Sequence, residues 1–336
     1  MIKTNVFCRV VSLYGVFFVS IIYAVMEKDA KIYVAGHRGL VGSAIVRNLI
    51  AAGYTNIVGK TSAELDLRNQ QAVKEFFDNE QPDYVFLAAA KVGGIHANNT
   101  YPAEFIHDNL AIQTNVIHQA YLHDVKKLVF LGSSCIYPRA CPQPIKEEYL
   151  LTSALEKTNE AYAVAKIAGL KMCEFYNKQY GTSFIAAMPT NLYGPNDNFN
   201  VETSHVIPAL LVKIYNAYKN NSPTCEVWGT GNPRREFLHV DDLARAVVLL
   251  MNEYDQESIV NIGSGTDLTI RELVMLIKDL IGYQGEIVWK SSQPDGTPRK
   301  LLNIDLLTSM GWQPEIALTD GLQETIAWCH QNGIFN

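Results

Sequence analysis

A tyrosine and a lysine four residues apart, Tyr162 and Lys166, form the first pair in the chain with a clear chemical use. They fall within a stretch of helical pattern, residues 155–180, where positions four apart share one face. An ammonium beside a phenol favours the phenolate, so we expect a lowered pKa for Tyr162 and proton exchange with a carbonyl oxygen. The same spacing recurs at Tyr215 and Lys219, but without comparable support, and that copy is interpreted as a packed or solvated helix face.

The segment 132–138 follows an apolar strand expected over residues 127–131 and precedes the helix that carries Tyr162. The carboxyl ends of parallel strands are where doubly wound sheets bind their ligands. Ser133 is placed to donate a hydrogen bond to the same oxygen that Tyr162 protonates. A serine, tyrosine and lysine set of this kind predicts hydride transfer at a carbonyl or carbinol carbon.

Cys135 and His205 form a second candidate pair. A lone cysteine is usually an inert buried hydrophobe, but Cys135 lies two residues beyond Ser133, where a thiol could move a carbon-bound proton. His205 begins a predicted helix after a long loop and could be the acid partner. Position alone does not decide whether Cys135 and His205 are functional or structural residues.

A glycine-rich loop follows the first predicted strand, residues 31–35, and opens a helix predicted over 40–52. Its first glycine permits a tight turn, its second lets backbone N–H groups approach a pyrophosphate, and its third lets the helix pack closely on the sheet. The strand–loop–helix context favours a dinucleotide site over a glycine-rich turn without a ligand. The predicted loop contacts are Gly36, His37, Arg38, Gly39, Leu40, Val41 and Gly42.

The charge beyond the second strand, expected over residues 56–59, distinguishes the two nicotinamide cofactors. An NAD enzyme usually places an acidic residue there for the ribose 2′-hydroxyl, whereas this chain continues with Lys60 and two uncharged residues. Arg38 and Lys60 could pair with a 2′-phosphate, which predicts NADP(H), although both could be solvated surface cations. Asp66 and Leu67 could contact the adenine or be helix-capping surface residues.

Short apolar stretches alternate with helical ones as far as residue 187. Strands are expected over 31–35, 56–59, 84–88, 127–131 and 183–187, and helices over 40–52, 72–79, 102–123 and 155–180. The alternation requires crossover connections, so the predicted fold class is α/β, a Rossmann-type doubly wound and mostly parallel sheet. Two later segments rich in Pro, Gly, Asn and Asp, 191–204 and 291–300, are expected to be long loops with substrate contacts.

Three parts are expected along the chain. Residues 1–25 are an N-terminal extension, residues 26–190 an NADP-binding Rossmann domain, and residues 191–336 a smaller substrate-binding lobe. This lobe is expected to be interleaved with late sheet strands near residues 237–240 and 259–262. The apolar part of the extension could be a signal-like segment, a membrane anchor or sequence upstream of a natural start at Met26, and the last is favoured.

The composition is that of a folded protein, with 48% hydrophobic and 18% charged residues among 336. A net charge of −6 argues against nucleic acid as the main partner, but a local basic pocket for an anionic ligand remains compatible with it. The six cysteines form no CxxC pair and no cluster with histidine spacing, so neither a metal site nor a disulfide framework is expected. A reducing, cytoplasmic location fits best.

Several segments together resemble the extended short-chain dehydrogenase/reductase family, and within it the branch that makes GDP-L-fucose. The resemblance covers essentially residue 26 to the C-terminus. The Lys91–Ile95 and Ser133–Pro138 segments distinguish this branch better than the glycines do. The other matching segments are 36–42, 88–95, 162–166, 189–195, 204–208, 235–242 and 295–300.

This resemblance implies that GDP-4-keto-6-deoxy-D-mannose is epimerised at C3 and C5 and then reduced at C4 by NADPH. Cys135 would be the base and His205 the acid of the epimerisations, while Tyr162 would protonate the C4 oxygen, supported by Lys166 and Ser133. The further cofactor contacts implied are Leu131, Gly132, Ser133, Ser134, Tyr162, Lys166, Pro189, Thr190, Asn191, Leu192 and His205.

On the substrate side, Arg235 and Lys213 would face the diphosphate, Trp228 the nucleotide-sugar and Asp295 polar substrate groups. Without the resemblance, Arg235 could form a structural salt bridge and Trp228 could be core. Lys213 could be a solvated helix residue, and Asp295 a turn former before Gly296. The sequence departs from the family in having little positive charge after the second strand, which places more weight on Arg38, and in its N-terminal extension.

The competing functions are another NADP-linked nucleotide-sugar reductase or 4-epimerase, and a non-catalytic NADP-sensing protein. A 4-epimerase needs no second acid/base pair, so Cys135 and His205 argue against it, and a sensor has no chemical need for Ser133, Tyr162 and Lys166. A GDP-sugar substrate is the expected partner, together with a second copy of the chain in a homodimer. Neither a nucleic acid nor a stable membrane partner is expected.

Overall fold

A computed structural model describes residues 10–13, 16–19, 25–256, 259–292 and 295–335, and its centre is a six-stranded parallel sheet. The strand order is β12-β7-β6-β5-β3-β4, and every neighbouring pair in it is parallel. Its strands are β3 (Ile32–Ala35), β4 (Ile57–Val58), β5 (Tyr84–Leu87), β6 (Lys127–Leu131), β7 (Phe184–Pro189) and β12 (Val260–Ile262). The α/β, Rossmann-type fold predicted from the alternating pattern is confirmed.

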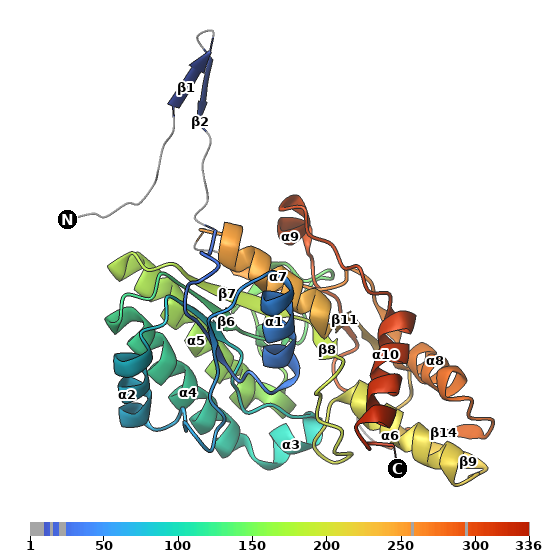
Figure 1. Cartoon of the computed structure of the whole chain (residues 1–336). Helices are drawn as coiled ribbons and strands as arrows, with labels where there is room; N and C mark the ends of the chain where they lie inside the picture. The colour runs from blue at the N-terminus through green and yellow to red at the C-terminus, as the bar shows by residue number, and fades with distance from the viewer. Residues whose placement is uncertain (1–9, 14–15, 20–24, 257–258, 293–294, 336) are drawn as a thin grey trace.

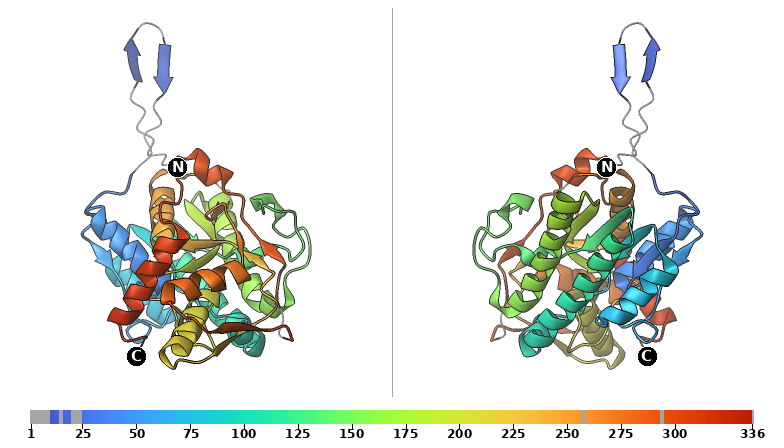
Figure 2. Two further views of the ribbon diagram at one scale, coloured as in Figure 1. Left: turned by 90° about the vertical axis from the view of Figure 1, so that its right-hand side faces the viewer. Right: turned by 90° about the vertical axis from the view of Figure 1, so that its left-hand side faces the viewer.

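Helices cover both faces of this sheet (Figures 1 and 2). One core packs α1 (Leu40–Ala51) and α7 (Val240–Glu253) on the first face, and a second core packs α2 (Gln70–Glu80), α4 (Pro102–Leu122) and α5 (Glu160–Tyr180) on the other. Residues of β3, β5 and β7 are all buried. A parallel strand covered on both faces is apolar throughout, which explains the short continuous apolar runs in the sequence.

The helix that carries Tyr162 is shorter than the pattern indicated. We expected residues 155–180 to be one helix, but α5 begins at Glu160, and a 3₁₀ turn, η3 (Lys157–Asn159), precedes it. The Glu156 side chain accepts a 3.4 Å hydrogen bond from the Thr158 backbone and so starts this tighter turn. Gly181 ends α5 in the left-handed conformation, with φ of 68°, which glycine adopts readily.

The C-terminal part of the chain has a third core, built around α6 (Val206–Lys219), α8 (Ile270–Ile281) and α10 (Leu318–Gln331). Small sheets surround it. They pair β8 (Asn191–Tyr193) with β11 (Phe237–His239), β9 (Thr224–Trp228) with β14 (Glu286–Lys290), and β10 (Arg234–Arg235) with both β13 (Leu268–Thr269) and β15 (Arg299–Lys300).

Of the two late strands expected in the central sheet, only one lies there. The strand β12 pairs with β7, whereas β11 pairs with β8 in a separate two-stranded sheet. The reason is that β8 follows β7 after a single residue and takes β11 as its neighbour instead. The loop expected over 191–204 therefore begins with a strand. Two residues of the other expected loop, 293–294, lie outside the described residues.

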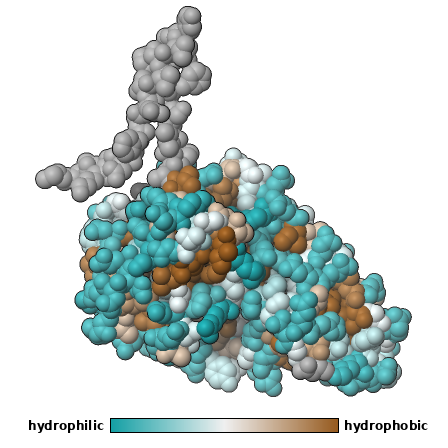
Figure 3. Space-filling model, in the orientation of Figure 1, coloured by the Kyte–Doolittle hydropathy of each residue, from teal (hydrophilic) through white to brown (hydrophobic). Residues whose placement is uncertain are grey.

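The remaining short elements are α3 (Ile95–Thr100), α9 (Asp305–Ser309) and the 3₁₀ turns η1 (Ser134–Ile136) and η2 (Glu147–Tyr149). In the N-terminal extension, β1 (Val10–Leu13) pairs with β2 (Val16–Val19) in antiparallel fashion, while residues 1–9, 14–15 and 20–24 lie outside the described residues. Within the described residues, no helix is both long and apolar enough to cross a membrane. On the face drawn in Figure 3, hydrophilic residues cover most of the surface.

Candidate active site

The candidate residues gather at the carboxyl edge of the central sheet. The chain leaves β3, adds β4 on one side and then returns to add β5 on the other, so the order of the strands reverses between β3 and β5. In an open α/β sheet the crevice at such a reversal is the usual ligand site. The glycine loop follows β3 and the Ser133–Cys135 segment follows β6, so both lie at this edge.

The glycine loop has the shape of a phosphate cradle. Gly36 has φ of +83°, and a Cβ there would lie 2.9 Å from the backbone nitrogen of Ala89. A Cβ at Gly42 would strike the carbonyl oxygen of Gly36, so that glycine allows α1 to begin against the turn. The first turn of α1 has no side-chain cap at Gly39 and no acidic residue. Its free N–H groups and the helix dipole therefore fit a pyrophosphate.

Arg38 and Lys60 converge on a carboxylate that the sequence analysis missed. Glu64 accepts hydrogen bonds from the backbone N–H and hydroxyl of Thr61, at 2.8 and 2.7 Å. These bonds, together with the charges of Lys60 and Arg38, lower the pKa of Glu64. The charges of both cations thus act on one exposed anion, and a 2′-phosphate would be a second anion for them.

The side chain of His37 lies against the second strand. A Cβ at Gly59 would collide with the His37 ring, so Gly59 provides the space for that imidazole. The His37 Nδ1 atom is buried and has no hydrogen-bond partner among the described residues. A buried polar atom of this kind usually has a partner, so His37 fits a loop that closes around a bound group. Leu40 and Val41, the next residues of the loop, pack on the first core.

Asp66 and Leu67 have partners within the chain. The Asp66 carboxylate is held by Arg68 through contacts at 3.0 Å to Nε and 2.9 Å to Nη2. The carbonyl oxygen of Leu67 accepts a 2.9 Å hydrogen bond from Asn115. Only atoms of Asp66 and Leu67 that these bonds leave free could contact the adenine. That contact stays a prediction.

The end of β6 brings the reactive side chains together. Ser133 caps η1 by accepting a 3.2 Å hydrogen bond from the backbone N–H of Cys135. A hydrogen bond also joins Ser133 to Tyr162, and Cys135 acts on the pKa of the same phenol. The serine, the thiol and the phenol thus lie within one small space, although Tyr162 belongs to α5 and the other two residues to the segment after β6.

We expected Lys166 to lower the pKa of Tyr162, and the structure shows that this prediction is wrong. Burial raises the pKa of Tyr162, a hydrogen bond with Ser133 partly opposes this, and Lys166 is not among the causes. The Lys166 Nζ atom donates a 2.7 Å hydrogen bond to the carbonyl oxygen of Leu131 and lies 5.8 Å from the centroid of the Tyr162 ring. Burial also lowers the pKa of Lys166 to about 7, which weakens it as a source of charge.

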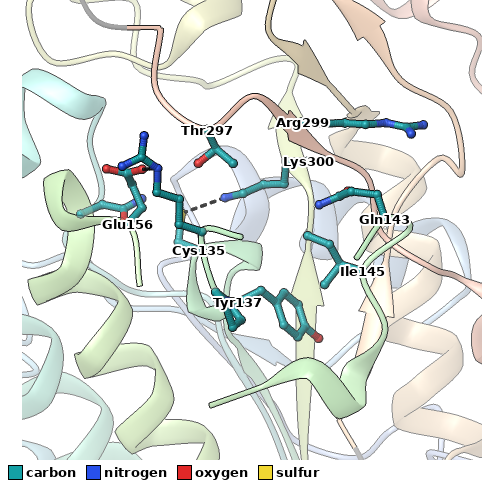
Figure 4. Close-up of a pocket in the computed structure, with 11 residues that line it drawn as sticks. Cys135, Tyr137, Gln143, Ile145, Glu156, Thr297, Arg299 and Lys300 are labelled. Atoms are coloured by element: carbon teal, nitrogen blue, oxygen red, sulfur yellow. Dashed lines mark hydrogen bonds and ion pairs between the residues drawn. The ribbon is translucent and has the colours of Figure 1, made fainter. Parts of the chain in front are cut away.

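Lys300 is a further cation, which lies beside the thiol and whose charge also acts on the imidazole. Its Nζ atom is 3.6 Å from Cys135 Sγ (Figure 4). It also lowers the pKa of His205, after the larger effect of desolvation around that ring. The backbone of His205 caps α6, while its side chain makes no cap hydrogen bond and stays available. Lys300, which the sequence analysis had not assigned, thus acts on both Cys135 and His205, and the meeting of these two residues at one substrate stays a prediction.

A pocket opens beside Cys135 between the segment after β6 and the strand β15. Polar and charged side chains line much of it, and Figure 4 shows Lys300 extending across it toward Cys135. The side chains that line it include Arg139, Gln143, Glu156, Thr297 and Lys300. These side chains supply hydrogen-bond donors and acceptors next to Cys135.

The other expected cofactor residues line the same sheet edge. Gly132 donates a 2.8 Å backbone hydrogen bond to Ala187 of β7, and Ser134 is buried. Thr190 and Asn191 are tied to the carbonyl oxygen of Glu236, at 3.3 and 2.8 Å. Pro189 ends β7, while Leu192 lies in β8 and packs on the first core.

Trp228 and Lys213 form an exposed pair. The Trp228 side chain is 54% exposed, so it is not a core residue. The Lys213 Nζ atom lies 4.8 Å from the centroid of its ring, a cation–π distance. A flat apolar ring beside an ammonium is suited to a nucleotide, which presents a planar base and phosphates.

Arg235 and Asp295 differ in how their charged groups are bonded within the chain. The Arg235 guanidinium donates to the carbonyl oxygens of Arg234 and Asp295, at 2.8 and 3.4 Å, which leaves its charge without a carboxylate in these bonds. Its neighbour across the strand pairing is Lys300, so two cations face the Cys135 side. The Asp295 carboxylate instead accepts from the Thr230 N–H and hydroxyl, at 2.8 and 2.7 Å, as a turn former does.

The second tyrosine–lysine copy is structural, as expected. Tyr215 stacks on Phe335 with ring centroids 4.0 Å apart and packs against the third core. It lies on α6 and faces the C-terminal residues rather than the site.

Glu236 is a further residue that the sequence analysis missed. Its side chain is buried, and burial raises its pKa. The carboxylate accepts hydrogen bonds from the backbone N–H groups of Gly265 and Leu302, at 2.7 and 3.0 Å. It therefore fixes the chain just beyond Lys300. In the sequence, Glu236 stands out only as an acidic residue next to Arg235. Its role could not be read there, because both of its N–H donors are distant in sequence.

Comparison with known proteins agrees with this geometry. The model of the NAD dependent epimerase/dehydratase family matches residues 32–263. The chain is 60% identical to GDP-L-fucose synthase 1 of Arabidopsis thaliana, over 91% of this chain and 95% of that one. It is 52% identical to GDP-L-fucose synthase of Escherichia coli, over 90% and 97%.

A solved structure of a GDP-L-fucose synthetase from Naegleria fowleri bound to NADP is also similar. Its TM-score is 0.87 at 31% identity, and the match covers 94% of this chain and 97% of that one. The resemblance inferred from the motifs is thereby confirmed. The chain belongs to the NAD dependent epimerase/dehydratase family and, within it, to the GDP-L-fucose synthases.

Proposed function

We propose that this protein converts GDP-4-keto-6-deoxy-D-mannose to GDP-L-fucose, with Cys135 and His205 as the acid/base pair and Ser133, Tyr162 and Lys166 as the reductase group. The observation that carries the assignment is the position of Cys135, which lies beside the Ser133–Tyr162 pair and 3.6 Å from the Nζ atom of Lys300, a cation whose charge also acts on His205. A simple C4 reductase needs the serine and the phenol, but not a thiol and imidazole at the same ring.

In the epimerisations, the 4-ketone makes the hydrogens on C3 and C5 acidic. The Cys135 sulfur accepts the proton from carbon, and the electron pair moves onto the C4 oxygen, where Ser133 and Tyr162 can donate hydrogen bonds. An imidazolium at His205 then returns a proton to the carbon from the opposite face. Lys300 places a positive charge next to the sulfur while that sulfur carries negative charge.

For the C4 reduction, the groups present fit NADPH. The uncapped first turn of α1, the glycine cradle, and the cations Arg38 and Lys60 would hold its phosphates. When bound, NADPH supplies the hydride for C4. Tyr162 gives its phenolic proton to the C4 oxygen, and Ser133 orients that oxygen. Lys166 lies one turn further along α5, and its Nζ atom is bonded to the end of β6.

On the substrate side, Trp228 and Lys213 would contact the nucleotide, and Arg235 the diphosphate. Asp295 would act mainly by shaping the turn around Thr230, and only its remaining acceptor capacity would reach the substrate. Apart from these residues, the pocket beside Cys135 gives the sugar a polar lining.

The decisive experiment is incubation of the protein with NADPH and GDP-4-keto-6-deoxy-D-mannose, followed by stereochemical analysis of the product. GDP-L-fucose is the expected product. A C4-reduced sugar that keeps its starting C3 and C5 configurations would identify a simple reductase instead, and no NADPH oxidation would contradict both enzymatic assignments.

We further propose a homodimer that pairs through the outer faces of α4 and α5. These helices expose Leu122, Phe175 and Tyr180, with exposed fractions of 53%, 55% and 47%. Tyr180 stacks on Tyr121 with ring centroids 4.2 Å apart, which joins the two helices into one aromatic surface. Light scattering after size-exclusion chromatography tests this, and a monomer at all concentrations would reject it. A cytoplasmic location is proposed because the chemistry requires Cys135 as a thiol.

A further inference from the structure

Two adjacent glycines before α3 contact the residues that lead into His205. The Gly94 backbone N–H donates a 2.9 Å hydrogen bond to the carbonyl oxygen of Thr203. A Cβ at Gly94 would lie 2.5 Å from the carbonyl oxygen of Ser204, the residue immediately before His205. Real Cβ atoms do not approach a backbone oxygen so closely, so the two backbones could not keep this spacing with any other residue at Gly94.

The requirement for glycine comes from this close approach and not from the backbone conformation. Gly94 has φ of −66° and ψ of 180°, a region open to every residue type. Alanine at this position would therefore meet no conformational strain, and its methyl group would act only by pushing the Ser204 backbone away. This makes Gly94 an unusually specific probe of the position of His205.

The opposite side of the segment faces the reductase group. A Cβ at Gly93 would lie 3.1 Å from Cζ of Phe105, and Phe105 meets the Tyr162 ring edge to face with centroids 6.4 Å apart. Asn98 fixes the segment, because its side-chain amide donates to the carbonyl oxygens of Gly93 and Gly94, at 2.7 and 3.0 Å. The glycine pair thus lies between the elements that carry Tyr162 and His205.

We propose that Gly94 is a positioning residue for His205: it sets the distance of the acid from the sugar ring and so controls epimerisation separately from reduction. This inference rests on the proposed function. It also gives a role to the Lys91–Ile95 segment, which distinguishes this branch of the family in sequence but contains none of the residues placed in the chemistry. A displacement of about 1 Å at a catalytic group can slow a reaction by roughly a hundredfold.

The experiment separates the two reactions in the same protein. With NADP⁺ present and no NADPH, the protein is incubated with GDP-4-keto-6-deoxy-D-mannose in D₂O, and deuterium at C3 and C5 is measured by mass spectrometry. With NADPH, the ratio of unepimerised to epimerised C4-reduced product is measured. Gly94→Ala is expected to slow deuterium uptake by roughly ten- to hundredfold and to raise the share of unepimerised product.

Gly53→Ala is the control for a general loss of stability. Gly53 has φ of +86°, and a methyl group there would have no other atom within 4 Å, so alanine strains the backbone without touching the site. It should lower the melting temperature but leave the product ratio unchanged. If Gly94→Ala acted only through a loss of stability, the product ratio would respond in the same way in both variants. A positioning effect changes the product ratio only for Gly94→Ala.

Asn98→Ala provides a second route if Gly94→Ala does not fold. It removes the amide that holds both glycine carbonyls, and it is expected to shift the product ratio in the same direction. Unchanged deuterium uptake and an unchanged ratio in a folded Gly94→Ala or Asn98→Ala variant would overturn the inference. The proposed function fails separately, if the wild-type protein itself incorporates no deuterium at C3 or C5.

Discussion

The Nζ atom of Lys166 donates a 2.7 Å hydrogen bond to the carbonyl oxygen of Leu131, the last residue of β6. The ammonium is thus directed toward the sheet and away from the phenol of Tyr162. Burial favours the neutral amine, and the pKa of Lys166 falls to about 7. The charge state of this lysine is therefore sensitive to pH in the range where an enzyme works.

The first prediction concerns stability and pH. Because the folded-state pKa of Lys166 is lowered from its usual value, the unfolded chain binds one more proton between about pH 7 and 10. In that window the contribution of Lys166 to the free energy of unfolding rises with pH, by at most about 1.4 kcal/mol per pH unit. From pH 7 to pH 9, the melting temperature of the wild type, measured without cofactor, should therefore rise relative to that of Lys166→Met. Parallel curves would show that Lys166 stays charged.

The second prediction concerns the phenol. Tyr162→Phe removes the proton donor at the C4 oxygen, and NADPH oxidation should slow by roughly a hundred- to ten-thousandfold. Deuterium uptake at C3 and C5 should fall less, because Ser133 still donates to that oxygen. Oxidation at the wild-type rate would remove Tyr162 from the reduction.

The third prediction concerns the thiol. Cys135→Ser replaces the base by a hydroxyl that ionises far less readily, and deuterium uptake at C3 and C5 should drop by roughly a hundredfold or more. NADPH should bind as it does to the wild type, since Cys135 is not part of the glycine cradle, and fluorescence titration measures this. Full turnover by this variant would assign the base elsewhere.

The fourth prediction uses Lys300. Desolvation and the nearby Lys300 charge lower the pKa of His205. Lys300→Met removes the charge, so the pKa of His205 should rise and the imidazolium should persist to higher pH. In a plot of the deuterium-exchange rate against pH, the decline that reports deprotonation of His205 should then move to higher pH. The maximal exchange rate should also fall roughly tenfold or more, because the hydrogen bond to the sulfur is lost. A decline that does not move would separate Lys300 from His205.

The fifth prediction concerns cofactor choice. Arg38→Ala should raise the KM for NADPH roughly ten- to hundredfold, the value of one hydrogen bond to a charged group, with little effect on the KM for NADH. Glu64→Gln is the matched variant, because it frees Arg38 and Lys60 from their anion, and it should lower the KM for NADPH. Equal effects of Arg38→Ala on both cofactors would show that Arg38 does not contact the 2′-phosphate.

Local features of the sequence were sufficient for the central fold. The apolar strands and the glycine loop are short-range patterns, and their bounds agree with the structure within one or two residues for β3, α1, β5, β6 and α4. The start of α5 was wrong because Glu156 captures the Thr158 backbone in a turn that helical periodicity does not reveal. The expected place of residues 237–240 in the central sheet was wrong because strand pairing depends on contacts distant in sequence.

The sequence was informative about the candidate site where one motif contains the residues, as Ser133 and Cys135 do in the segment after β6. The site was not predictable where two segments meet. Lys300 reaches Cys135 across 165 positions, because β15 pairs with β10 and places Lys300 beside Arg235. Glu64 escaped notice because it lies four residues beyond Lys60, past the place where an acidic residue is usually sought.

The pairing of β10 with β15 has a consequence for the newly made chain. Residue 300 leaves the ribosome long after Cys135 and Tyr162, so the sulfur meets its ammonium only when nearly the whole polypeptide has been synthesised. Until then the thiol of Cys135 lacks the ammonium that Lys300 places beside it. A chain that ended before residue 300 would contain Ser133, Cys135, Tyr162 and His205 without this cation.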